Sequence, residues 1–96
     1  MTYNSHSELP IRSKRIMAQD VAEIIQCLHK GDRSYANLLI EDLKIRAINF
    51  DLTVQQDVLM FVESVQFQAV YDPWHKVTPD IEIAANRLLS DLGIWL

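Results

Sequence analysis

Apolar residues recur every three or four positions through most of this chain, and no other feature of the sequence constrains its fold as strongly. That spacing places them on one face of a helix, whereas a strand would need alternation at every second residue. Turn-forming residues are also scarce, with 2 Gly and 3 Pro in 96 residues. So few turn-forming residues argue against an all-β chain with many short strands and tight turns.

Four segments carry the helical spacing, and each has a main apolar face that we expect to be buried. In residues 13–31 the face consists of Met17, Val21, Ile24, Ile25 and Leu28. In residues 32–50 it consists of Ala36, Leu39, Ile40, Leu43, Ala47 and Phe50. In residues 53–71 it consists of Val54, Val58, Phe61, Val62, Val65 and Ala69, and in residues 78–93 of Ile81, Ala84, Ala85, Leu88 and Leu92.

Capping residues predict where these helices begin and end. The expected N-caps are Ser13, Asp32 or Ser34, Thr53 in a capping box with Gln56, and Thr78 followed by Pro79. Gly31 and Gly93 stand where a left-handed residue ends a helix. Four helices with short connections predict an all-α fold, a small antiparallel four-helix bundle. We expect residues 1–12 to form a mobile N-terminal segment and residues 13–96 to form a single helical domain.

Charge and composition narrow the class of protein. The net charge is −4, with seven basic and six acidic groups in residues 1–46 but two basic and seven acidic groups in residues 47–96. An acidic second half repels phosphate backbones and favours basic protein partners. No signal-peptide pattern and no apolar run of membrane-spanning length occurs, and the single Cys27 fits a reducing compartment. We therefore expect a cytoplasmic bacterial protein without a membrane span.

Catalytic and metal-binding patterns find little support. Asp72, His75 and Lys76 lie close together in the link between the last two helices, but no nucleophile or Gly-rich loop accompanies them. The histidines are far apart in sequence, and Glu41 and Asp42 are adjacent on a helix, as expected for a solvated face. We expect no enzyme activity, no cofactor, no metal site and no small-molecule substrate.

One basic segment raises the possibility of nucleic-acid binding. The segment contains Arg12, Lys14 and Arg15, at the start of the first predicted helix. Residues 16–48, two helices joined by a tight turn, could be interpreted as a helix–turn–helix. The second helix of that unit carries Glu41 and Asp42, which disfavour contact with DNA. A solvated basic patch is therefore the favoured interpretation, and a DNA-associated transcriptional regulator is the alternative function.

A second set of apolar residues lies outside the main faces. Its members are Leu38, Ile45 and Ile48 in the second helix, Met60, Phe67 and Tyr71 in the third, and the aromatic residues Trp74 and Trp95. Two explanations stay open. These two helices are central and covered on both sides, or the extra residues form an interface with another protein chain, self or heterologous.

The chain resembles small helical bacterial proteins in length, acidic balance and helix count, including toxin-neutralising immunity proteins and small regulatory connectors. The spacing in "VAEIIQCLHKGD", "LLIEDL" and "LTVQQDVLMFVESV" is similar to that of biofilm-associated connector proteins. The resemblance consists of hydrophobic spacing alone, so it assigns no functional role to any residue of this chain. The sequence favours a non-enzymatic protein–protein interaction module, expected to be homodimeric. It would act as a regulator, adaptor or immunity-type inhibitor by covering a partner's surface.

Overall fold

A computed structural model describes the backbone of residues 3–71 and 77–93, and the side chains of residues 12–67 and 77–93. Throughout those residues the chain is helical or in turns, and it forms no strand. The helices are α1 (Tyr3–Lys30), α2 (Arg33–Ala47), α3 (Leu52–Tyr71) and α4 (Pro79–Asp91). The predicted all-α, four-helix fold is confirmed.

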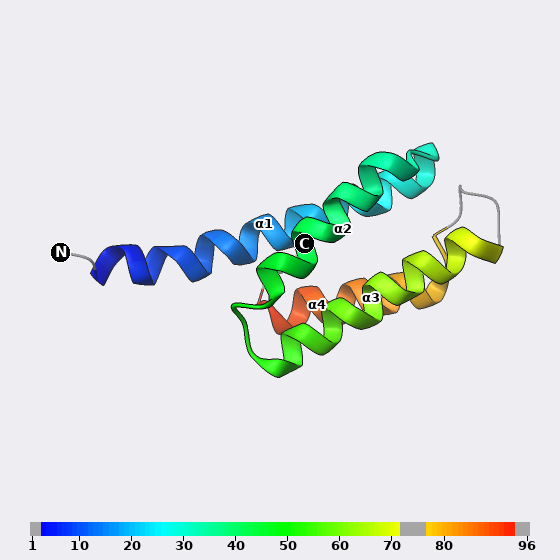
Figure 1. Cartoon of the computed structure of the whole chain (residues 1–96). Coiled ribbons are helices and arrows are strands. Elements are labelled where there is room, and N and C mark those ends of the chain that lie inside the picture. Colours follow the sequence, from blue (N-terminus) through cyan, green and yellow to red (C-terminus); the bar gives the residue numbers. More distant parts are fainter. Residues whose placement is uncertain (1–2, 72–76, 94–96) are drawn as a thin grey trace.

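The four helices form two hairpins that pack against each other (Figure 1). α2 folds back along α1 after a two-residue connection, and α4 folds back along α3. Contacts between α2 and α3 hold the hairpins together. α1, with 28 residues, is nearly twice as long as the 15-residue α2, so its N-terminal part extends beyond the hairpin.

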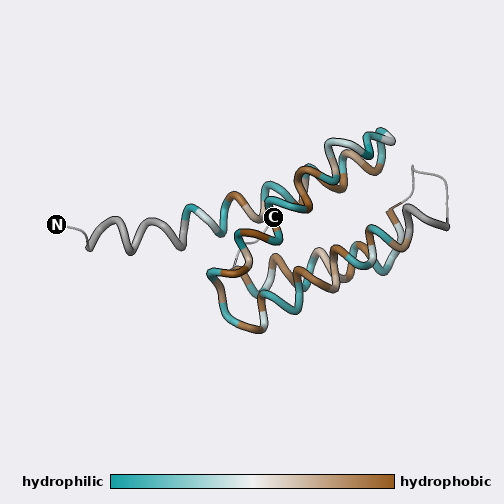
Figure 2. The backbone as a smooth tube through the Cα atoms, viewed as in Figure 1, coloured by the Kyte–Doolittle hydropathy of each residue, from teal (hydrophilic) through white to brown (hydrophobic). Residues whose placement is uncertain are grey.

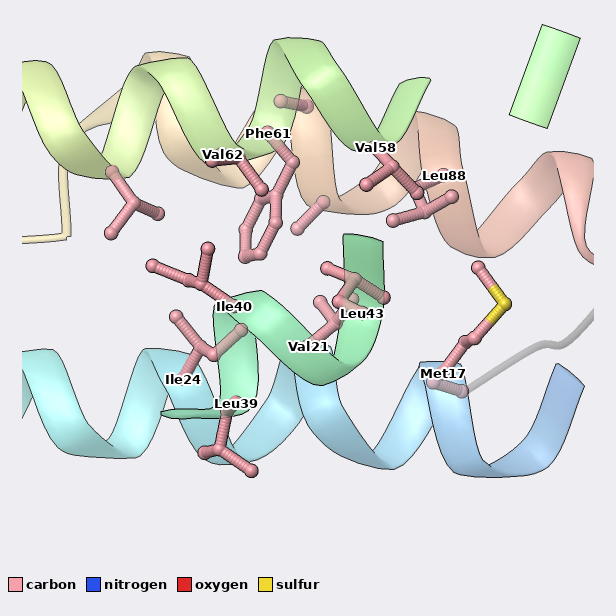
Figure 3. Packing of buried hydrophobic residues seen from close by; sticks show 14 of the residues in the cluster. Met17, Val21, Ile24, Leu39, Ile40, Leu43, Val58, Phe61, Val62 and Leu88 are labelled. Atoms are coloured by element: carbon pink, nitrogen blue, oxygen red, sulfur yellow. The ribbon is translucent and has the colours of Figure 1, made fainter. Parts of the chain in front are cut away.

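The core lies between the two hairpins. Phe61, which is fully buried, projects from α3 toward Ile40 of α2, and Val21 and Ile24 of α1 lie beneath them (Figure 3). Leu88 of α4 joins the same cluster. Burying a large side chain of this kind contributes about 1.5–3 kcal/mol. The inner faces of all four helices therefore meet in one core.

The predicted main faces are confirmed almost throughout the described side chains. Ile25 and Phe50 differ, because they are only partly buried and pack against the edge of the core. Cys27 and Leu89 are buried although neither was assigned to a main face. A helical face is broad, so residues one position away from the central stripe can also be covered.

Two of the predicted helix starts and both predicted ends match the structure, since Gly31 and Gly93 each have φ of 76° just after a helix. Asp32 caps α2, where its Oδ1 accepts a hydrogen bond from the Tyr35 amide at 3.2 Å, and Thr78 caps α4 in the same way with the Ile81 amide at 3.3 Å. Gly31 has φ of 76°, and it lets the Asp32 amide return to the Cys27 carbonyl at 2.9 Å. This pattern closes the last turn of α1 and turns the chain into α2.

Two predicted helix starts are wrong. Ser13 lies inside α1, which begins at Tyr3, so no helix boundary separates residues 3–12 from residue 13 onward. The mobility of the predicted segment 1–12 stays a prediction. α3 begins at Leu52, and its first turn is capped by Asp51, whose Oδ1 accepts from the Val54 amide at 3.0 Å. Thr53 is therefore inside the helix. The Gln55 side chain, instead of Gln56, reaches back to the Phe50 carbonyl at 2.9 Å.

Candidate functional site

The extra apolar residues that the sequence singles out are exposed wherever the structure describes their side chains. On α2 and its C-cap the exposed fractions are 67% for Leu38, 63% for Ile45 and 71% for Ile48. On α3 they are 42% for Met60 and 66% for Phe67. The Tyr71 side chain, Trp74 and Trp95 lie outside the described residues. Apolar positions recur along every helix (Figure 2), and each of these five is at least 42% exposed.

Helix geometry explains why α2 has two apolar sides. Leu39, Ile40 and Leu43 face the core, while Leu38 and Ile45 are separated by seven residues, two turns, on the outer side. Leu52 (66% exposed) and Leu59 (55%) are separated in the same way on α3. We refer to Leu38, Ile45, Ile48, Leu52 and Leu59 together as the outer apolar face.

A groove opens on the outer apolar face where α2 ends and α3 begins. It has a volume of about 290 Å³, and its lining includes Lys44, Ala47, Ile48, Leu52, Gln55 and Leu59. The connection between the two helices spans only residues 48–51. The end of α2 and the start of α3, which form the two sides of the groove, therefore lie close together. Most of the lining is aliphatic, so the groove suits an apolar side chain.

A second hollow lies on the other side of α3. It has a volume of about 490 Å³, and Met60 and Phe67 line it together with Glu63 and Ser64 of α3 and Thr78 and Asp80 at the start of α4. Ser64 Oγ donates to the Met60 carbonyl at 2.9 Å. Two carboxylates make this hollow more polar than the groove, so the predicted surface divides into two regions of different character.

Leu52 and Ile83 are exposed apolar residues that the sequence did not single out. Leu52 was missed because the helix was expected to begin at Thr53, which left Leu52 outside it. Ile83, 64% exposed on α4, lies two positions from the buried Ile81 and so points away from the core. Its position outside the main apolar face of α4 could have predicted this exposure from the sequence.

A buried carboxyl group lies beside a half-buried one in the first hairpin. Asp20 of α1 is 5% exposed and shares a hydrogen bond with Asp42 of α2. Burial, that hydrogen bond and the charge of Asp42 raise the pKa of Asp20 to about 8. Asp42 in turn accepts from Arg46 Nε at 2.9 Å. The hydrogen bond from Asp20, together with Arg46, lowers the pKa of Asp42.

Asp42 is therefore only in part the solvated carboxylate that the sequence suggested, because its side chain is 40% exposed. Glu41 does face solvent, where it pairs with Lys44 at 3.3 Å, but Asp42 is half-buried against α1. Two adjacent helix positions point in different directions, and only one of them is at the contact between helices.

The second hairpin has a matching pair. Asp57 of α3, also 5% exposed, shares a hydrogen bond with Asp91 of α4. Burial and Asp91 raise the pKa of Asp57 to about 6. In both Asp20 and Asp57 the Oδ2 atom has no hydrogen-bond partner. Each hairpin thus contains a carboxyl group that stays in place best when protonated.

Within the described residues, no three His, Cys, Asp or Glu side chains lie where they could hold a metal ion. Cys27 is buried, and burial raises the pKa of its thiol, whereas His29 is exposed. The link residues Asp72 and His75 lie outside the described part of the chain.

The basic segment lies on α1. Arg12 and Arg15 are exposed one turn apart, while Lys14 is half-buried. Two exposed arginines on a helix could contact nucleic-acid phosphates, but exposed arginines that are only hydrated are equally common on protein surfaces. Nucleic-acid contact by Arg12, Lys14 and Arg15 stays a prediction.

Comparison of this chain with protein-family models, with curated proteins and with solved structures finds no match. None of the described helices is both long and apolar enough to cross a membrane.

Proposed function

We propose that this chain is a non-catalytic protein-binding module that acts by covering a partner's surface with its outer apolar face. The single observation that supports this most strongly is the exposure of Leu38, Ile45 and Ile48, each above 60%, on a helix whose other side is already buried. Aliphatic side chains gathered on one surface and rimmed by polar residues are typical of protein-interaction sites.

The groove adds a feature suited to recognition. It places Ile48, Leu52 and Leu59 around a concave apolar space, with Lys44 and Gln55 at its edge. An apolar side chain entering it would be surrounded by aliphatic groups, and the polar edge would fix its orientation. A regulator, an adaptor and an immunity-type inhibitor would all use such a surface in this way.

Site-specific photo-crosslinking tests the proposal. A photoreactive amino acid placed at Ile48 in the cells from which the sequence comes should give a discrete protein adduct, because that position would lie inside the interface. The control is the same substitution at Ile83, which is 64% exposed on α4 and outside the outer apolar face. Adducts from neither position, or equal smears from both, would show that this face binds no specific protein.

A further inference from the structure

The outer side of α2 carries a seam with the spacing of a helix–helix contact. Leu38, Glu41, Ile45 and Ile48 stand at i, i+3, i+7 and i+10, which is the alternating three-and-four spacing of an interhelical seam. All four are exposed in the structure. The seam spans about 15 Å, three helical turns.

The charges near this seam are arranged so that two copies of the chain would attract each other. Its midpoint lies at the level of Leu43, with Glu41 just before it and Lys44 just after it. An antiparallel second copy, related by a two-fold axis through that midpoint, would set Glu41 of each chain beside Lys44 of the other. A parallel copy would instead set Glu41 against Glu41. Within one chain the same two side chains already attract each other, at 3.3 Å.

The two ends of the seam fit each other in that same register. Leu38 of one copy comes to lie opposite Ile48 of the other. Ile48 forms one lip of the apolar groove that Leu52 and Leu59 complete. Leu38, 67% exposed, is an aliphatic side chain of suitable size to enter it. The two-fold axis repeats the contact, so both grooves are filled at once.

We infer that the partner of the outer apolar face is a second copy of this chain, bound through antiparallel α2 helices with Leu38 in the groove of the other copy. This inference rests on the proposed function, because it names the occupant of the same surface. The five residues of the outer apolar face are far fewer than the roughly 20 residues per partner of a standard interface, so the dimer is expected to dissociate in the micromolar range.

Charge-reversal variants, examined alone and mixed, test the inference. Glu41→Lys makes the centre of the seam wholly basic, and Lys44→Glu makes it wholly acidic. Sedimentation equilibrium across the micromolar range should take the wild-type chain from 11.1 kDa toward twice that mass. Each single variant should self-associate about tenfold more weakly, a loss of about 1.4 kcal/mol. An equimolar mixture of the two variants should form the dimer again, as should the double variant alone.

Rescue by mixing is the decisive result. The ion pair inside one chain cannot produce it, since both single variants lack that pair. Leu38→Glu should abolish association and Ile83→Glu should leave it unchanged, with circular dichroism confirming that each variant is folded. A wild-type chain that stays monomeric, or a mixture no different from the single variants, overturns the inference. If crosslinking at Ile48 then captures a different protein, the proposed function stands without a second copy.

Discussion

Asp20 and Asp57 place carboxyl groups at contacts between helices, where an ionised pair would repel. Asp20 faces Asp42, and Asp57 faces Asp91, from the neighbouring helix of each hairpin. The positive charge of Arg46, which donates to Asp42, lowers the pKa of Asp20, and that of Arg87 on α4 lowers the pKa of Asp57, but neither outweighs burial. A proton on the buried member turns each repulsion into a hydrogen bond, so the stability of both hairpins depends on pH.

Because the pKa of folded Asp20 is about 8, above its ordinary 3.8, the folded chain keeps a proton that the unfolded chain releases. The contribution of Asp20 to the free energy of unfolding is therefore greatest below pH 3.8 and falls as the pH rises toward 8. Asp57, with a pKa of about 6, adds to the fall below pH 6. Asp42 acts in the opposite sense, because its lowered pKa contributes stability that is lost in acid.

Asp20→Asn should remove the loss of stability between pH 6 and pH 8, because an amide donates to Asp42 without titrating. At pH 8 its free energy of unfolding should exceed that of the wild type by about 1–3 kcal/mol, the range for one buried hydrogen-bonding group. Urea denaturation across this pH range measures it. Asp57→Asn is the matched control and should reduce the pH dependence of the free energy of unfolding only below pH 6. A wild-type stability that is constant or rises from pH 6 to pH 8 would contradict this account.

At the scale of elements, the buried faces could be predicted because helical spacing is a local property of the sequence. Val54, Val58, Phe61 and Leu88 all lie inside as expected. Helix ends were harder, since neighbouring residues compete to cap them. Asp51 and Thr53 are both good N-caps, and the sequence alone does not say which amide each will reach.

Asp51→Ala should lower the free energy of unfolding by about 1 kcal/mol, because it leaves the Val54 amide without its acceptor. Thr53→Ala should change it by less than about 0.5 kcal/mol, since Thr53 is an exposed residue inside the helix. Thermal or urea denaturation distinguishes the two variants. The reverse order of effects would mean that α3 begins at Thr53.

The acidic pairs could not be predicted from spacing. Asp20 meets Asp42 only because α1 and α2 pack in one particular register, which is a property of the assembled hairpin and not of either helix. The exposed residues Leu38, Ile45 and Ile48 were predicted correctly as lying outside the main face of α2. Leu52 was missed with the helix start, and the groove that it lines was missed with it.

The whole molecule exposes the outer apolar face although a bundle of this kind already has a well-filled core. The core takes residues from all four helices, so it does not need Ile45 or Leu59 to close it. Such a surface lowers the solubility of an isolated chain, and exposed apolar patches are typical of sites that bind another protein. We propose that another protein covers the outer apolar face in the cell.

Hydroxyl-radical footprinting tests that claim most directly. Ile45 and Ile83 are a matched pair, 63% and 64% exposed, on different helices. Labelling in living cells is compared with labelling of the purified chain at nanomolar concentration, where a weak assembly has dissociated. The account predicts that Ile45 is labelled several-fold less in the cell while Ile83 is unchanged. Equal labelling of Ile45 under both conditions would contradict it.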